Sequence, residues 1–304
     1  MNDTIPATGH LLGAADIRRI AADAGISPTK KFGQNFVIDP GTVRRIVREA
    51  GVTAADHVME VGPGLGSLTL AILETGATMT AVEIDPPLAE RLPGTVAEFM
   101  PEATSRLTVV NRDALTVAPE NVPDFSDDAS FTLVANLPYN VATPILLTLL
   151  ERFDNLGSFL VMVQKEVADR LAAKPGSKIY GTPSVKLAWY GTAERVGTIG
   201  RNVFWPAPNV DSALVKFTRY QADDPAAPGA SNSTADGGAQ RELDFADRCG
   251  VRSASQDPAR GIEDHCALRG ILHRRHRSDP SRRDAHHRRI HRSGQGHRIV
   301  WRWR

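Results

Sequence analysis

The segment from Asn136 to Tyr139, Asn-Leu-Pro-Tyr, combines residue types suited to binding a planar ring that carries an amino group. The asparagine amide oxygen and a carbonyl of the turn can accept hydrogen bonds from an exocyclic NH2 group, and the tyrosine ring can stack on the base. The apolar run 131–135 predicts a strand, which Pro138 ends because proline has no N–H to donate to a neighbouring strand. The apolar run 141–150 predicts a helix. The segment is therefore expected at the carboxyl end of a strand, where open α/β sheets bind ligands.

A glycine-rich turn at residues 62–66 is a second candidate binding element. A strand is predicted before it, at 57–62, and a helix after it, at 67–73, so backbone N–H groups at a helix start can come close to a ligand. Glu83 lies 21 residues after Gly62, in a further predicted strand at 78–84. This spacing is typical of the acidic residue that meets ribose hydroxyls in nucleotide-binding βαβ units.

The glycine pattern differs from that of nicotinamide dehydrogenases. Ser67 stands where the G-x-G-x-x-G pattern requires its third glycine, and Glu60 precedes the turn. A lone glycine-rich turn is common in α/β proteins, so its meaning depends on the other motifs. A nicotinamide oxidoreductase is therefore only a distant hypothesis, which cofactor binding would test.

Other apolar runs predict strands and helices in alternation. Strands are expected at 107–110, 159–163, 185–190 and 212–220, and helices at 14–24, 40–50 and 165–173. This rhythm indicates an α/β fold with a doubly wound parallel sheet. Two loops can belong to the site: 175–181 as a flexible segment that closes over it, and 203–211 as a rigid loop that presents Phe204 or Trp205 to a flat ligand.

Length and composition indicate an ordinary globular enzyme. The 304 residues suffice for one large and one smaller domain, and the hydrophobic share of 41% is typical of globular proteins. Cys249 and Cys266 cannot form a disulfide framework and lack metal-ligand spacing, so we expect no metal site. No apolar run reaches the length of a membrane span, and the N-terminus lacks the apolar segment of a signal peptide, so we expect a cytoplasmic protein.

The net charge of +1 conceals an uneven distribution along the chain. Residues 241–304 hold 16 arginines, no lysine and 8 acidic residues, whereas residues 1–240 hold 20 basic and 27 acidic residues. Seven of the nine histidines also lie within 241–304. The two parts of the chain therefore require separate explanations.

Six sequence blocks together resemble one family, the S-adenosylmethionine-dependent rRNA adenine N6,N6-dimethyltransferases of the KsgA/RsmA type. The blocks, which cover roughly residues 28–220, are Phe32-Gly-Gln-Asn-Phe-Val37, Glu60-Val-Gly-Pro-Gly-Leu-Gly66, Val82-Glu-Ile-Asp85, Arg112-Asp-Ala114, Asn136-Leu-Pro-Tyr-Asn140 and Phe204-Trp-Pro-Ala-Pro-Asn-Val-Asp-Ser212. Six blocks in the order of the family are far more specific than any one of them. The resemblance implies a Rossmann-like class I methyltransferase with a seven-stranded, mostly parallel sheet.

The resemblance also implies where S-adenosylmethionine, the methyl donor, would bind. Asn35 and the backbone of Val37 would border its methionine and ribose side, and the turn at Gly62 would approach its amino-acid portion. Glu83 would accept hydrogen bonds from both ribose hydroxyls, and Asp113 would bind the adenine amino group.

The resemblance implies that Asn136 lies beside the methyl-bearing sulfonium of the cofactor and also contacts the target base. Acceptors at the Asn136 side chain and the Leu137 carbonyl would draw the target N6 toward tetrahedral geometry, because its lone pair is otherwise delocalised into the ring. Pro138 belongs to the same rigid turn. Tyr139 and Phe204 would sandwich the base once it leaves its stack. No strong base is required.

Within this family, the small-subunit type targets two adjacent adenines near the 3′ end of 16S rRNA, and the macrolide-resistance type dimethylates one adenine of 23S rRNA. The forms of the glycine turn, of 136–140 and of 205–212 favour the small-subunit type, with 16S rRNA in the small ribosomal subunit as partner and a monomeric enzyme. The alternatives are a 23S rRNA methyltransferase and a noncatalytic RNA-binding ribosome-assembly factor.

The resemblance divides the chain into four parts. We expect an N-terminal extension and helix at 1–27, the methyltransferase domain at 28–220, a linker at 221–240, and an Arg/His-rich tail at 241–304. This tail replaces the small helical RNA-docking domain of the family, and its few large apolar residues predict disorder. It could be a basic arm for RNA phosphates or a metal-binding histidine tract. A reading-frame shift near residue 240 is the hypothesis we favour.

Overall fold

The computed structural model of the chain describes residues 10–26, 34–125 and 129–221. The predicted linker at 221–240, apart from residue 221, and the Arg/His-rich tail at 241–304 lie outside the described residues. Within them, no helix is both long and apolar enough to cross a membrane.

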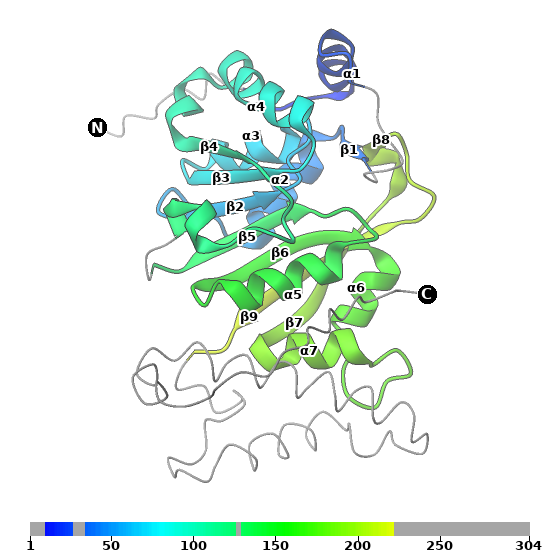
Figure 1. Cartoon of the computed structure of the whole chain (residues 1–304). Helices are drawn as coiled ribbons and strands as arrows, with labels where there is room; N and C mark the ends of the chain where they lie inside the picture. The colour runs from blue at the N-terminus through cyan, green and yellow to red at the C-terminus, as the bar shows by residue number, and fades with distance from the viewer. Residues whose placement is uncertain (1–9, 27–33, 126–128, 222–304) are drawn as a thin grey trace, which may run out of the picture. The chain divides into compact units, whose positions relative to one another are not determined.

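One sheet of seven strands forms the centre of the described part (Figure 1). Its strands are β2 (His57–Val61), β3 (Thr78–Glu83), β4 (Leu107–Asn111), β5 (Phe131–Asn136), β6 (Leu156–Gln164), β7 (Gly191–Ile199) and β9 (Ser212–Arg219). They lie in the order β4-β3-β2-β5-β6-β9-β7, and β9 alone runs antiparallel to the other six strands. The predicted seven-stranded, mostly parallel sheet is confirmed.

The strand order reverses between β2 and β5. From β2 the chain moves outward through β3 to β4, and it then returns to the other side of β2 to add β5 and β6. A reversal of this kind leaves a crevice at the carboxyl ends of the two strands, because their connections depart in opposite directions. The polar ends of β2, β3, β4 and β5 all meet at this edge of the sheet.

Helices cover the sheet and complete its core. They are α1 (Ala14–Asp23), α2 (Pro40–Ala50), α3 (Ser67–Glu74), α4 (Pro86–Phe99), α5 (Ala142–Arg152), α6 (Lys165–Leu171) and α7 (Thr182–Tyr190). Right-handed crossovers that leave the switch point in opposite directions place α3 and α5 on opposite faces of the sheet, an arrangement that can be followed in Figure 1. The central strands are consequently buried on both faces and read as nearly continuous apolar runs.

Local sequence signals determine where α2 begins and ends. The Asp39 side chain accepts a hydrogen bond from the backbone N–H of Thr42 at 2.7 Å, and Pro40 occupies the first turn. The helix ends at Gly51, whose φ of 76° is left-handed. These signals predict the helix at 40–50 without error, because they act within one helical turn.

One predicted strand is wrong. Residues 185–190 belong to helix α7, and the strand in this region is β7, at 191–199. The helix begins at Thr182-Pro183, where the backbone N–H of Gly181 donates to the Ser184 hydroxyl at 3.3 Å. The aromatic and β-branched residues after this start pack in the interior and resemble a strand in the sequence. β7 is an edge strand with exposed polar residues, so it lacks a clear apolar alternation.

A second, two-stranded sheet holds the chain segment before α2, residues 34–38, which we call the strap. Strand β1 (Phe36–Val37) pairs antiparallel with β8 (Phe204–Trp205). The backbone N–H of Ile38 also donates to the Val203 carbonyl at 2.8 Å. The loop at 203–211 therefore supports the strap.

Candidate active site

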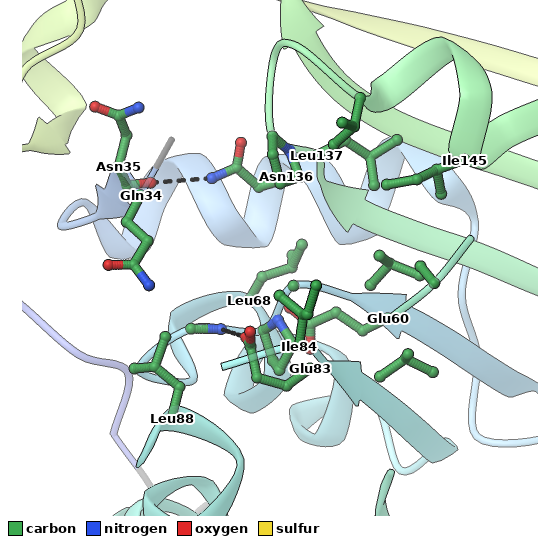
Figure 2. Close-up of a pocket in the computed structure, with 18 of the residues that line it drawn as sticks. Gln34, Asn35, Glu60, Leu68, Glu83, Ile84, Leu88, Asn136, Leu137 and Ile145 are labelled. Atoms are coloured by element: carbon green, nitrogen blue, oxygen red, sulfur yellow. Dashed lines mark hydrogen bonds between the residues drawn. The ribbon is translucent and has the colours of Figure 1, made fainter. Parts of the chain in front are cut away.

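A cavity opens at the switch point between β2 and β5 (Figure 2). Its walls come from the strap, the glycine turn with the start of α3, the ends of β3 and β4, and the turn after β5. The cavity brings together nine residues predicted from the sequence: Asn35, Val37, Gly62, Glu83, Asp113, Asn136, Leu137, Pro138 and Tyr139. Segments about one hundred residues apart in the chain therefore form one site, as expected from the carboxyl ends of neighbouring parallel strands.

The glycine turn needs glycine at three positions. Gly62, Gly64 and Gly66 have φ values of 70°, 58° and 98°, a left-handed conformation that side chains disfavour. A Cβ atom at Gly64 would also lie 2.9 Å from the ring of Phe36 in the strap. The turn can therefore pass close under the strap and direct the start of α3 at the cavity.

Glu83 is a buried acceptor in the cavity wall, with 4% of its surface exposed. One carboxylate oxygen accepts from the backbone N–H of Gly64 at 3.2 Å (Figure 2). The other accepts from the backbone N–H of Asp85 at 3.0 Å. Burial raises the pKa of Glu83, and these backbone hydrogen bonds oppose the rise. A carboxylate has about four lone-pair positions for hydrogen bonds, so hydroxyl groups of a ligand could also donate to Glu83.

Glu60 is a second buried carboxyl group, and the sequence analysis did not place it in the site. It has 1% of its surface exposed, lines the cavity, and accepts a hydrogen bond from the Thr69 hydroxyl at 2.6 Å. Burial raises the pKa of Glu60 to about 8; the Thr69 hydrogen bond lowers it, and the nearby Glu83 raises it further. At neutral pH, Glu60 is therefore mostly protonated. Its position directly before the glycine turn was the available sequence signal.

Asp113 lies at the end of β4, where two hydrogen bonds connect β4 to Glu83. The Asn111 amide and the backbone N–H of Arg112 donate to the Glu83 carbonyl at 2.8 and 2.9 Å. One Asp113 oxygen accepts from the backbone N–H of Leu115 at 2.9 Å. These contacts fix the Asp113 carboxylate on the same cavity wall as Glu83.

The strap is attached to three walls of the cavity. The Gln34 amide donates to Asp85 at 2.9 Å, the Asn136 amide nitrogen donates to the Asn35 carbonyl at 3.1 Å, and the Ser67 hydroxyl donates to the Val37 carbonyl at 2.6 Å. Figure 2 shows the Asn136 amide nitrogen directed at Asn35, so its amide oxygen faces another direction. This hydrogen bond therefore orients the one side-chain acceptor of Asn136.

The turn after β5 is rigid at both ends. The backbone N–H of Leu137 donates to the Met162 carbonyl at 3.0 Å, and that of Val141 donates to the Pro138 carbonyl at 3.2 Å. Tyr139 is half-buried, and its hydroxyl lies 2.8 Å from the Ser212 hydroxyl. Burial raises the pKa of the Tyr139 phenol, and the hydrogen bond to Ser212 opposes this rise.

Phe204, predicted to pair with Tyr139 around a base, lies elsewhere. It belongs to β8, has 3% of its surface exposed, and packs in the hydrophobic core. Its backbone pairs with Val37 of the strap, and it is not among the residues that line the cavity. In this structure, Phe204 pairs with the strap and does not reach the cavity.

The two loops expected at the site contribute to a second hollow. Its lining includes Ile179 of the first loop, Val210 of the second, and Arg201 just before the second. Within the described residues, no group of three or more His, Cys, Asp or Glu side chains is arranged to hold a metal ion.

The chain matches a known protein family and its curated members. The family model for ribosomal RNA adenine dimethylase matches residues 27–227. "Ribosomal RNA small subunit methyltransferase A" of Bifidobacterium longum strain NCC 2705 is 98% identical over 245 residues, which are 81% of this chain and 80% of the relative. The protein of the same name from Leifsonia xyli is 60% identical over 214 residues, 70% of this chain and 74% of the relative.

Two solved structures share the fold at the same level of sequence identity. The 23S rRNA methyltransferase ErmE is 25% identical with a TM-score of 0.58, covering 75% of this chain and 83% of its own. A dimethyladenosine transferase from Plasmodium falciparum is 25% identical with a TM-score of 0.52, covering 61% of this chain and 63% of its own. Both are methyltransferases, which agrees with the predicted methyltransferase fold.

Proposed function

The chain belongs to the ribosomal RNA adenine dimethylase family, and from this premise we propose that it dimethylates the N6 amino group of adenines in 16S rRNA of the small ribosomal subunit. The methyl donor is S-adenosylmethionine. The observation that carries the proposal is a single cavity that holds both the acidic groups of a nucleoside site and the Asn136–Tyr139 turn.

The residues around the cavity fit S-adenosylmethionine. The buried Glu83 carboxylate suits two ribose hydroxyls as an acceptor, and Asp113 suits an exocyclic amino group. Ile84 lies between these groups in sequence and lines the cavity with 46% of its surface exposed, which offers an apolar face to an adenine ring. Asn35, Val37 and the Gly62 turn would hold the amino-acid end. When bound, the cofactor supplies a methyl group on a positively charged sulfur.

The turn after β5 would position the target amine. We assign the Asn136 amide oxygen and the Leu137 carbonyl as acceptors for the N6 hydrogens, because two acceptors on one side direct the nitrogen lone pair to the other side. Asn35 supports this role by fixing the Asn136 amide nitrogen. The Tyr139 ring would stack on the base, and Pro138 would keep the turn rigid. The monomethylated amine keeps one N–H, so the second transfer requires only one acceptor.

The relatives favour the small subunit over the alternatives. Relatives that are 98% and 60% identical carry the name of a small-subunit methyltransferase, whereas the 23S rRNA enzyme ErmE is 25% identical. The intact turn after β5 disfavours a noncatalytic assembly factor. We further propose that the two targets are adjacent adenines near the 3′ end, and that the protein acts as a cytoplasmic monomer.

The proposal is tested by transfer of labelled methyl from S-adenosylmethionine to small ribosomal subunits that lack dimethyladenosine. The unmutated chain should produce N6,N6-dimethyladenosine at two positions. Asn136→Ala should lower the rate at least about 100-fold, because it removes an acceptor used on the reacting amine. Calorimetry should show that the variant still binds the cofactor. Binding of RNA with no methyl transfer by the unmutated chain would support the assembly factor and contradict the proposal.

A further inference from the structure

The Tyr139 and Ser212 hydroxyls form a contact that the mechanism above does not use. Their oxygens lie 2.8 Å apart, and either group can be the donor. Tyr139 lines the cavity, whereas Ser212 is fully buried, with 0% of its surface exposed, and is not among the lining residues. Tyr139 therefore connects the Ser212 hydroxyl to the cavity.

Ser212 is fixed by the sheet on both sides. It is the first residue of β9, which lies between β6 and β7, and it pairs with the last residue of each, Gln164 and Ile199. The residue before it, Asp211, accepts a hydrogen bond at its carbonyl from the backbone N–H of Lys165 at 3.0 Å. The backbone of Ser212 is therefore held between two neighbouring strands.

Tyr139, in contrast, lies in a turn. Its backbone position depends on the neighbouring hydrogen bonds of Leu137 and Val141, and these do not set the direction of its ring. The phenol hydroxyl at the far end of the ring meets Ser212. With both ends held, the ring has one orientation at the cavity wall.

We propose that Ser212 is a positioning residue for methyl transfer, which holds the Tyr139 ring as a stacking face for the target adenine and keeps the phenol hydroxyl away from the reacting atoms. The inference rests on the function proposed above. It makes Tyr139 an aromatic surface and not a proton donor or acceptor for the substrate. The antiparallel strand β9 thereby becomes part of the site although it lies outside the cavity.

A double-mutant cycle tests this role. Tyr139→Phe keeps the ring and removes its hydroxyl, and Ser212→Ala removes the partner. Each should lower kcat for transfer to small ribosomal subunits by about three- to tenfold, the effect of one hydrogen bond between neutral groups. The double variant should be no slower than the slower single variant, because both changes break the same contact. The affinity for S-adenosylmethionine, measured by calorimetry, should stay within about twofold, since neither hydroxyl belongs to the cofactor wall.

A matched control exists near the amino ends of the central strands β5 and β6. The hydroxyls of Thr132 in β5 and Ser158 in β6 lie 2.9 Å apart, away from the carboxyl ends of these strands. Thr132→Val and Ser158→Ala remove a comparable hydroxyl pair. These variants should lose thermal stability to a similar degree but keep the kcat of the unmutated chain. If kcat falls in proportion to the loss of thermal stability in all four single variants, the control pair included, the positioning role is overturned.

Two other results would also overturn the inference. An unchanged kcat in Ser212→Ala would show that the contact does not matter for transfer. A much larger loss in Tyr139→Phe than in Ser212→Ala, with additive effects in the double variant, would show that the phenol acts on the substrate itself. If the unmutated chain binds cofactor but transfers no methyl, the proposed function fails first, and the positioning role fails with it.

Discussion

At the residue scale, the two buried carboxyl groups of the cavity wall, Glu83 and Glu60, differ in the groups that donate hydrogen bonds to them. Glu83 receives two backbone hydrogen bonds, whereas Glu60 receives the Thr69 hydroxyl and is nearly inaccessible. Burial raises the pKa of both, and that of Glu60 reaches about 8. Glu60 is therefore mostly protonated at neutral pH and adds little negative charge to the cavity wall.

The raised pKa of Glu60 predicts a pH dependence of stability. Its folded-state pKa of about 8 lies above the ordinary value of 4.5, so the folded chain holds a proton that the unfolded chain has released between these pH values. Stability should therefore fall as pH rises from about 5 to about 8, with a slope of at most about 1.4 kcal/mol per pH unit, and level off above. Glu83 contributes in the same direction.

Urea denaturation at pH 6, 7 and 8 measures this slope. Glu60→Gln keeps the shape of the side chain and a hydrogen-bond acceptor for Thr69 but cannot ionise, so its slope should be clearly smaller. An equal slope in the variant and the unmutated chain would mean that Glu60 is not the group that titrates.

At the element scale, the glycine turn and the strap are fitted to each other. Gly64 adopts a left-handed conformation and passes so close to Phe36 that a Cβ atom would lie 2.9 Å from its ring. Phe36 in turn belongs to β1, which β8 holds in place. The two cavity walls therefore depend on one close approach, and a small enlargement of the turn should displace the strap.

Gly64→Ala and Gly51→Ala separate backbone strain from this close approach. Gly51 has a φ of 76°, close to the 58° of Gly64, but a Cβ atom there would meet nothing within 4 Å. Gly51→Ala should lower the free energy of unfolding by about 1–2 kcal/mol and leave the cofactor affinity unchanged. Gly64→Ala should lower stability by more and weaken S-adenosylmethionine binding at least about tenfold. Urea denaturation and calorimetry measure both quantities, and equal cofactor affinities would contradict the predicted role of the contact.

At the scale of the whole molecule, the composition of the chain changes after the predicted linker. The Bifidobacterium longum relative is 98% identical over 245 residues, yet about a fifth of each chain lies outside the match. Residues 241–304 have 16 arginines and no lysine, unlike the preceding part of the chain. A segment of altered composition in a chain that is otherwise nearly identical to a relative is what the frameshift hypothesis predicts.

The frameshift hypothesis predicts that another frame of the same gene encodes, from about residue 240 onward, a continuation similar to the unmatched fifth of the relative. Sequencing the gene and translating all three frames tests this directly. If no frame encodes such a continuation, the Arg/His-rich tail belongs to the protein, and the basic RNA-binding arm becomes the better explanation of its composition.

The tertiary structure changed three expectations that local sequence could not decide. The segment 185–190 reads as a strand because its apolar residues are buried, but they are buried in a helix that starts at Pro183. Phe204 reads as a base-stacking residue because aromatic side chains beside proline suit that task, yet it packs in the core. Glu60 belongs to a motif in the sequence, but its burial depends on elements distant in the chain.

The sequence by itself determined most of the alternation of strands and helices, the position of Glu83, Asp113 and Asn136 at the carboxyl ends of strands, and the family. Each follows from residue types at short spacing. The tertiary structure alone decided the strand order, the hydrogen bond from Asn136 to the strap, and the contact between Tyr139 and Ser212. These features depend on contacts between segments far apart in the chain. Such contacts form through hydrophobic burial, so no local sequence pattern predicts them.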